Sequence, residues 1–283
     1  MKWYSKYASV YNKDYDGIDK TIISIVKSNI DSLQSDVPLI TVSVIGHNEE
    51  RHLLSCLWSL SEMKCKYPIE IIGVDNNSID KTSQIFKDCG VKLFKESRQS
   101  CGFARSCGVF NAKGMYHINI DADTMYPPKY VEIMSEKLMK KNIVAVSSLW
   151  SYIPDKQHSQ FGLLIYEFCR DFFLYIQSFK RPELSVRGLV FAYKTELARE
   201  IGIRTDIIRG EDGSLALGLK KYGKILFIKN KKARAITGYD TINCDGTLFK
   251  SFKKRVLFGL FNIKRIVTSQ KEYEDDVTNI VKH

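Results

Sequence analysis

The chain has 283 residues, which suits one large α/β domain with additions. Its 44% hydrophobic and 27% charged residues exclude a disordered chain, and it has no run of 18 apolar residues that would predict a membrane-spanning helix. Lys and Arg number 43 against 32 Asp and Glu, so the net charge is +11. This balance favours anionic partners such as nucleotides, phospholipid headgroups or nucleic acid.

The predicted elements begin with an N-terminal helical extension, residues 1–37, whose apolar residues between 18 and 33 follow helical spacing. From 39 to 150, β-branched runs alternate with helical patterns. This alternation predicts βαβ units and a Rossmann-like, mainly parallel twisted sheet flanked by helices. The predicted strands are 39–46, 69–75, 91–96, 115–121 and 143–150, and the predicted helices are 47–63, 80–89, 101–114 and 127–141.

Polar or acidic clusters follow three of these strands, at 47–50, 75–78 and 121–123. Ligands of parallel sheets bind beyond the carboxyl ends of the strands. The three clusters therefore predict one binding site at one edge of the sheet.

Asp121 and Asp123 end an apolar strand and could face one cavity. Their mutual repulsion would be relieved by Mn²⁺ or Mg²⁺, which commonly bind one or two carboxylates and substrate phosphate oxygens. The alternative is that these residues cap a helix or lie in a solvated turn.

Glu211 and Asp212 precede a helical stretch that ends at Gly223. They could supply a carboxylate general base at a rigid helix entrance. The alternative is simple capping, because the helix macrodipole favours acids at this end.

Two further segments bear on what the protein contacts in the cell. Residues 160–179 are very apolar, and the favoured interpretation is a buried helix or a dimer contact, with contact to a lipid-linked acceptor as the alternative. Residues 247–271 contain seven Lys or Arg and no acid, which suits either a membrane-surface helix or a helix docked on the domain.

The compartment is predicted from the cysteines and the N-terminus. The seven cysteines stand singly, without a CxxC pair, which argues against a zinc or redox motif and for a reducing compartment. The N-terminal sequence lacks the apolar core of a signal peptide. We therefore expect a cytoplasmic protein, either free or peripheral on the inner face of the membrane.

The order of the motifs resembles family 2 glycosyltransferases of the GT-A fold. The matching stretches are ITVSVIGHNEE (40–50), IEIIGVDNNSIDKT (69–82), GFARSCGVFNAKGMYHINIDADT (102–124), RGLVFAYKTELAREIG (187–202) and RGEDGSLALGLKKYG (209–223). The resemblance implies a GT-A domain over 38–243, with a nucleotide-sugar-binding half (38–125) and an acceptor-binding half (126–243). Residues 244–283 would form a basic amphipathic helix and tail.

The resemblance also implies roles for individual residues. The nucleoside would be held by Ile45, Gly46, His47, Asn48, Glu50, Asp75 and Asn76. Asp121, Ala122 and Asp123 match the family's Asp-x-Asp motif, in which the second Asp usually binds the metal and the first usually contacts ribose or sugar. Arg105 could reach a phosphate or the sugar, or be a solvated helix cation. Gly188 falls on the acceptor side, and Asp212 matches the catalytic base, with Glu211 beside it.

The chain departs from the family pattern at two points. Asn76 stands where many relatives carry a second Asp. No His occurs between 159 and 282, although many relatives have a late His that binds the metal. The metal would then have fewer protein ligands, or a residue around 234–240 would substitute.

The resulting hypothesis is a metal-dependent inverting glycosyltransferase, with Asp212 as base, of the kind that serves polysaccharide biosynthesis. The expected partners are a nucleotide-sugar donor, with UDP-sugar favoured, and a glycan or lipid-linked acceptor, with a peripheral membrane contact through 247–271 as a further option. No nucleic acid is expected. The alternative is a basic nucleotide- or nucleic-acid-binding protein without transferase activity.

Overall fold

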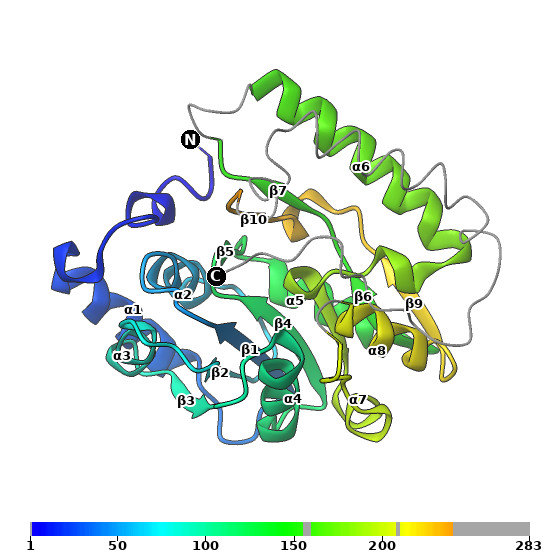
Figure 1. Cartoon of the computed structure of the whole chain (residues 1–283), viewed down its shortest axis with the longest axis horizontal. Coiled ribbons are helices and arrows are strands. Elements are labelled where there is room, and N and C mark those ends of the chain that lie inside the picture. Colours follow the sequence, from blue (N-terminus) through cyan, green and yellow to red (C-terminus); the bar gives the residue numbers. More distant parts are fainter. Residues whose placement is uncertain (1, 155–159, 208–209, 240–283) are drawn as a thin grey trace.

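The computed structural model describes residues 2–154, 160–207 and 210–239 (Figure 1). Within them, a seven-stranded sheet has the order β3-β2-β1-β4-β8-β6-β9, and a three-stranded sheet has the order β5-β10-β7. The strands are β1 (Ile40–Gly46), β2 (Ile69–Asp75), β3 (Lys92–Lys95), β4 (Tyr116–Asp121), β5 (Thr124–Met125), β6 (Ile143–Ser147), β7 (Trp150–Tyr152), β8 (Phe191–Lys194), β9 (Lys224–Phe227) and β10 (Ala235–Thr237).

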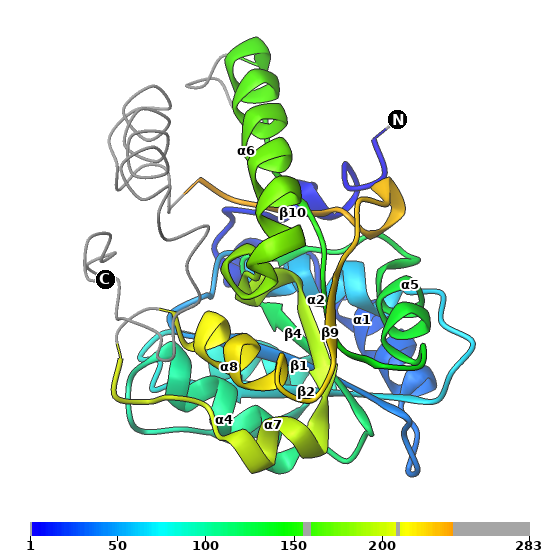
Figure 2. The same cartoon turned by 90° about the vertical axis from the view of Figure 1, so that its right-hand side faces the viewer.

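Helices cover both faces of the larger sheet (Figure 2). The helices are α1 (Lys20–Leu33), α2 (Leu53–Ser61), α3 (Thr82–Asp88), α4 (Cys101–Asn111), α5 (Tyr130–Leu138), α6 (Gln160–Lys180), α7 (Thr195–Ile201) and α8 (Glu211–Leu219). α1, α2 and α5 lie on one face, and α4, α7 and α8 lie on the other. The predicted flanked α/β sheet is confirmed, as is the predicted N-terminal helix.

One reversed strand brings a distant loop to the predicted site. β8 is antiparallel to its neighbours β4 and β6, whereas the other pairs in the larger sheet are parallel. The start of β8 therefore lies at the edge where β4 ends. Gly188, three residues before β8, reaches the site in this way.

Local sequence explains where the elements that carry the site begin. The Ser100 hydroxyl accepts from the Phe103 N–H at 3.2 Å and caps α4, the helix that carries Arg105. Such a cap stabilises a helix by about 1 kcal/mol. On β2, Gly73 leaves room for the ring of Phe86, which a β-carbon would meet at 2.6 Å. The close approach of α3 to the sheet therefore depends on glycine at this position.

Two predicted boundaries were wrong. The helix predicted over 47–63 begins only at Leu53, because the loop before it bonds to a neighbouring turn instead of to itself. The N–H groups of residues 48, 49 and 50 donate to the side chains of Ser78, Thr82 and Asp80, at 2.7–2.9 Å. The strand predicted over 143–150 is divided, because Ser148 N–H bonds to the Val190 carbonyl and β7 then joins the smaller sheet.

The 160–179 segment forms α6, but its predicted burial was wrong. The outward side of α6 carries large apolar side chains that are exposed, while only Leu163, Tyr166, Leu174 and Gln177 are buried. Among the described helices, none has the length and apolar character needed to cross a membrane. The predicted 247–271 helix and the 244–283 tail lie outside the described residues.

Candidate active site

Two aspartates stand at the carboxyl edge of the larger sheet. Asp121 is the last residue of β4, and Asp123 lies in the turn before β5. Arg105 donates from Nη2 to Asp121 Oδ1 at 2.6 Å, and its Nε lies 3.4 Å from Asp212 Oδ1. Because Arg105 is only 3% exposed, its interpretation as a solvated helix cation is wrong. One buried cation therefore joins the Asp-x-Asp motif to the predicted base.

Asp212, in the first turn of α8, also has a neutral partner. Asn119 Nδ2 donates to Asp212 Oδ1 at 3.2 Å, and the Tyr193 hydroxyl donates to Asn119 Oδ1 at 2.9 Å. Both partners are buried strand residues, so the carboxylate is positioned by rigid elements. Asp212 Oδ2 faces Gly188, where an added β-carbon would overlap both this oxygen and Arg105 Nη2. A side chain at position 188 would therefore disturb the ion pair.

The adjacent acids Glu211 and Asp212 both have a raised pKa. Burial and the charge of Asp212 raise the pKa of Glu211 to about 8. Burial also raises the pKa of Asp212, but the guanidinium of Arg105 opposes this rise. Two buried neighbouring acids do not both ionise readily, because the charge of one raises the pKa of the other. An ionised carboxylate with a raised pKa is suited to accept a proton.

The environment of Asp123 fits a divalent cation. The hydroxyls of Thr124 and Thr237 donate to Oδ1 and Oδ2, at 2.7 and 3.1 Å. Burial, together with the charges of Glu49 and Asp121, raises the pKa of Asp123 to about 7. A bound cation would offset this negative charge. In the described part of the chain, no three His, Cys, Asp or Glu side chains form a metal-binding group. Mn²⁺ and Mg²⁺ are commonly held by one or two carboxylates together with substrate oxygens.

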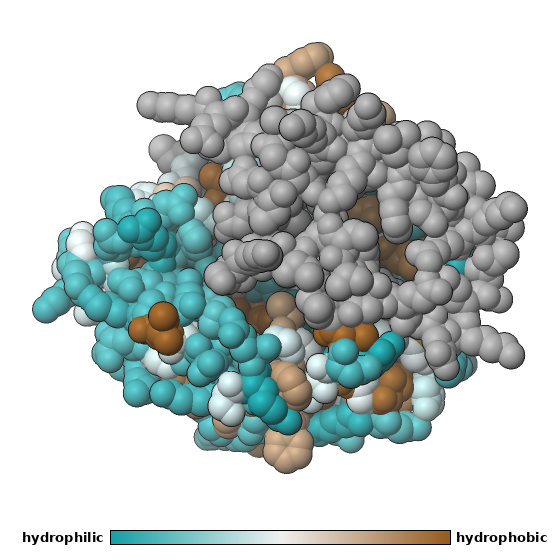
Figure 3. Space-filling view, in the orientation of Figure 1, coloured by the Kyte–Doolittle hydropathy of each residue, from teal (hydrophilic) through white to brown (hydrophobic). Residues whose placement is uncertain are grey.

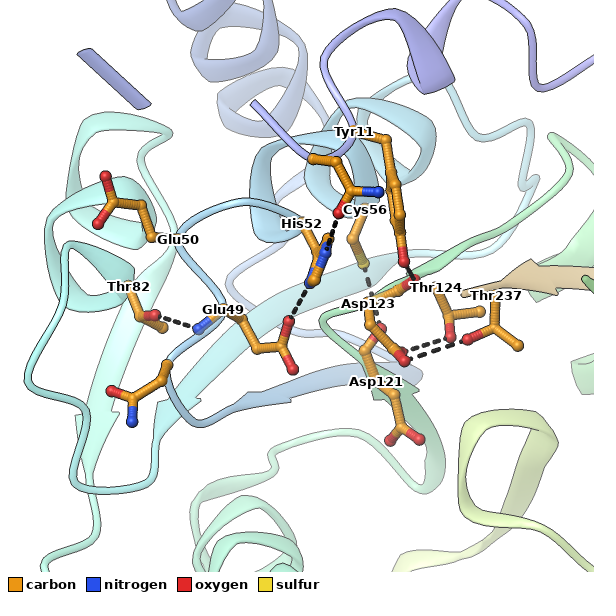
Figure 4. A network of polar contacts seen from close by, with 12 residues as sticks. Tyr11, Glu49, Glu50, His52, Cys56, Thr82, Asp121, Asp123, Thr124 and Thr237 are labelled. Carbon is orange, nitrogen blue, oxygen red and sulfur yellow. Dashed lines mark hydrogen bonds and ion pairs between the residues drawn. The ribbon is translucent and has the colours of Figure 1, made fainter. Parts of the chain in front are cut away.

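A chain of polar contacts joins the N-terminal extension to the turn of Asp123 (Figure 4). His52 Nδ1 lies 2.7 Å from Glu49 Oε2, and His52 Nε2 lies 2.7 Å from Asn12 Oδ1. Tyr11 stacks on the His52 ring at a centroid distance of 4.5 Å, and its hydroxyl donates to the Asp123 carbonyl at 3.2 Å. The extension therefore positions both the Glu49 carboxylate and the turn of Asp123.

The sequence did not identify three residues around Asp123. The contact of Tyr11 spans 112 residues, so no local pattern marks it. Thr237 lies within the 234–240 segment in which a substitute for the late His was expected, and spacing alone does not single it out. Glu49 points toward Asp123, whereas the predicted Glu50 points away and accepts from the Lys81 N–H at 3.3 Å. The turn of the chain, and not residue type, distinguishes the two glutamates.

The remaining predicted nucleoside-binding residues lie at neighbouring strand ends. Asp75 ends β2, and His47 Nδ1 lies 2.7 Å from the carbonyl of Asn76. Asn76 is buried, and its Nδ2 donates to the carbonyls of Glu96 and Arg98, at 3.2 and 2.8 Å. The amide hydrogens of Asn76 therefore hold the segment after β3, and pairing with a base would use its oxygen. The other members at this edge are Ile45, Gly46 and Asn48.

The family model described as glycosyl transferase family 2 matches residues 41–202, more than half of the chain. The chain belongs to this family. The family 2 match includes Asp121, Asp123 and Gly188, and it ends before Asp212 and Thr237. The predicted family is therefore confirmed, while the segments that complete the site lie on both sides of the match.

Among curated family 2 relatives, an uncharacterized glycosyltransferase of Rickettsia prowazekii is 30% identical over 128 residues, which are 43% of this chain and 39% of the relative. The chain thus spans about two fifths of the length of that relative.

Two solved structures resemble the fold. The mannosyltransferase PcManGT of Pyrobaculum calidifontis, in complex with GDP-Man and Mn²⁺, has a TM-score of 0.57 and 17% identity, covering 84% of this chain and 75% of that chain. TarS of Staphylococcus aureus, in complex with UDP-GlcNAc, has a TM-score of 0.53 and 17% identity, covering 70% and 58%. At these identities the likeness concerns the fold, and it confirms the predicted GT-A type.

Proposed function

We propose that the protein is a metal-dependent inverting glycosyltransferase, which moves a sugar from a nucleoside-diphosphate sugar to a hydroxyl group of a glycan or lipid-linked acceptor. The observation that carries this proposal is the ion-paired unit of Asp121, Arg105 and Asp212, because it sets a donor-side carboxylate and a base at one sheet edge. The nucleotide sugars bound by PcManGT and TarS support the donor class. Among nucleoside-diphosphate sugars, we favour a UDP-sugar as the donor.

On the donor side, residues 45–48 and 75–76 would bind the nucleoside at the ends of β1 and β2. Asp123, with Asp121, would hold Mn²⁺ or Mg²⁺, and this ion supplies positive charge to the diphosphate when bound. The Mn²⁺ in the PcManGT complex supports this choice of cation. Arg105 orients Asp121 by donating from Nη2 to its Oδ1 at 2.6 Å.

On the acceptor side, Asp212 would remove the proton of the attacking hydroxyl. The acceptor oxygen forms a bond to the anomeric carbon as the bond from that carbon to the diphosphate oxygen breaks, and the nucleoside diphosphate leaves. Attack from the opposite face in a single displacement inverts the anomeric configuration. Gly188, which we assign to the acceptor side, lies against Asp212 Oδ2. The raised pKa of Glu211, about 8, disfavours a second negative charge beside Asp212.

The test is release of nucleoside diphosphate from a panel of UDP-, GDP- and dTDP-sugars, with Mn²⁺ or Mg²⁺ and with metal removed by a chelator. Asp123→Ala and Asp212→Asn are expected to abolish release. Asp31→Asn, which alters only a surface ion pair on α1, is the matched control and should retain it.

Metal-dependent release from one donor, lost in both site variants, would support the proposal and name the donor. Tight donor binding without release, in the presence of candidate acceptors, would favour the alternative of a nucleotide-binding protein. If no donor binds, the transferase proposal is wrong. Peripheral membrane contact through 247–271 remains part of the proposal.

A further inference from the structure

The apolar side of α6 points away from the protein body. Eight large apolar side chains on this helix are between 41% and 73% exposed, and they are Phe161, Leu164, Ile165, Phe168, Phe172, Phe173, Ile176 and Phe179. Most of them recur every three or four residues, so they form one stripe along the helix. We name these eight residues the α6 stripe. At 1.5 Å per residue, the stripe is about 27 Å long.

Three charged residues in the middle of α6, Glu167, Arg170 and Asp171, contact the protein body instead. Glu167 accepts from the Ser151 hydroxyl at 2.7 Å and from the Tyr152 N–H at 2.9 Å. Arg170 stacks on the Trp150 ring at 4.2 Å and pairs with Asp171 at 2.8 Å. A surface helix normally buries its apolar side and exposes its charges. In α6 this arrangement is reversed, so the stripe requires a non-aqueous partner.

The surroundings of the α6 stripe are basic. Lys180 ends α6, Lys220 Nζ lies 3.5 Å from the Lys180 carbonyl, and Lys229 lies over the ring of Tyr175 at 3.3 Å. Basic residues beside exposed aromatic and aliphatic side chains are the pattern of proteins that lie in the interface of an anionic membrane.

The surface that is visible in Figure 3 agrees with this placement. Apolar residues reach the surface at the upper edge, where α6 begins in Figure 1, whereas the surface over α1 and α3 is mostly hydrophilic. Large exposed apolar side chains on an otherwise polar surface mark an interaction site. No described helix can cross a membrane, so a bilayer contact here would be with a helix that lies on the surface.

We infer that the α6 stripe docks onto a bilayer that contains anionic phospholipid. A second copy of the chain suits the stripe less well, because two molecules of net charge +11 repel each other. The stripe is also coupled to the acceptor side of the site. The Ser185 hydroxyl donates to the Leu174 carbonyl at 2.9 Å, and the chain then leads directly to Gly188. Docking through α6 would therefore bring this side of the protein close to lipid-linked acceptors.

The test is co-sedimentation of the full chain with vesicles of phosphatidylcholine, with and without about 30% phosphatidylglycerol, a mixture in which anionic lipid attracts nearby Lys and Arg. We expect binding to the anionic vesicles that weakens with salt. The double variant Phe168→Glu/Phe172→Glu should bind at least about tenfold more weakly, because it places charge in the apolar contact. Phe110→Glu changes a side chain that is 80% exposed on α4, and it should bind like the wild type.

Three results would overturn the inference. The first is binding that the double variant retains, which would place the contact elsewhere. The second is a dimer that the double variant disrupts, without vesicle binding by the wild type. The third is a monomer that binds no vesicles and whose α6 amides exchange faster once residues 247–271 are removed. That result would mean that the chain's own 247–271 segment covers the stripe. Donor turnover is measured without lipid, so failure here is distinguishable from failure of the proposed function.

Discussion

Replacing Arg105 with methionine tests the central unit of the site. Arg105 is buried between Asp121 and Asp212, at 2.6 and 3.4 Å. Its positive charge lowers the pKa of Asp212 against the effect of burial. In Arg105→Met this pKa rises, so a larger share of the base is protonated at neutral pH. We expect the acid limb of the pH profile of kcat/KM to move to higher pH.

The expected size of the shift follows from these contacts. A guanidinium this close lowers the pKa of a carboxyl by about 1–3 units, so its loss should move the limb upward by a similar amount. Each unit corresponds to about 1.4 kcal/mol of lost preference for the ionised base. Activity should recover as the pH rises above the shifted pKa. Leaving two carboxylates without their buried partner should also lower the free energy of unfolding by about 3–5 kcal/mol.

The assay is nucleoside diphosphate release from the donor identified by the panel, measured as kcat/KM from about pH 5.5 to 9.5, a range that spans the shift expected from loss of the guanidinium. Arg199→Met is the control. Arg199 is a partly buried guanidinium on α7 that donates to the Val109 carbonyl at 3.2 Å. Its loss should lower stability without moving the limb. A loss of activity in Arg105→Met that is equal at every pH would refute the reasoning.

Three further predictions concern the surroundings of this unit. Gly188→Ala should lower both activity and, by about 1–3 kcal/mol, the free energy of unfolding, because its β-carbon overlaps the ion pair. Gly17→Ala, whose β-carbon meets nothing within 4 Å, should change neither. The folded pKa of Glu211, about 8, lies above its unfolded value, so folding takes up a proton and stability falls as pH rises from about 4.3 to 8. Urea unfolding at several pH values gives the slope of the free energy of unfolding against pH. In Glu211→Gln this slope should be flatter than in the wild type by up to about 1.4 kcal/mol per pH unit, and equal slopes would contradict the prediction. Asn12→Ala removes a hydrogen-bond partner of His52, which in turn contacts Glu49. The loss of about one hydrogen bond should weaken Mn²⁺ binding, measured by calorimetry, about fivefold. Unchanged Mn²⁺ binding would contradict this role of the extension.

The sequence predicts the buried parallel strands well and the reversed strand poorly. β2 matches its prediction of 69–75, since a strand covered on both faces is a continuous apolar run between turn residues. β8 has four residues, and its pairing with β4 and β6 depends on partners far away in the sequence. The 47–63 segment has apolar spacing typical of a helix, but side chains of another segment accept from the N–H groups of residues 48–50, and α2 begins only at Leu53.

The residues of the site show the same contrast between local features, which could be predicted, and contacts between distant segments, which could not. Asp121 and Asp123 could be placed at one sheet edge because each strand end is a local feature. The role of Arg105 as a bridge could not be predicted, because it depends on α8 bringing Asp212 beside α4. The residues that surround Asp123 come from Tyr11 to Thr237, and contacts of such separation leave no mark in local periodicity.

This wide separation has a consequence for how the protein becomes active. Closing long loops is entropically costly, and chains with many distant contacts fold slowly. During synthesis Tyr11 and Asp123 emerge well before Thr237, so the hydroxyl that contacts Asp123 from β10 arrives last of the three. An incomplete chain would thus hold a partly formed sheet without a finished site. In refolding experiments, the return of activity should coincide with the slowest folding phase and not with the recovery of helical signal.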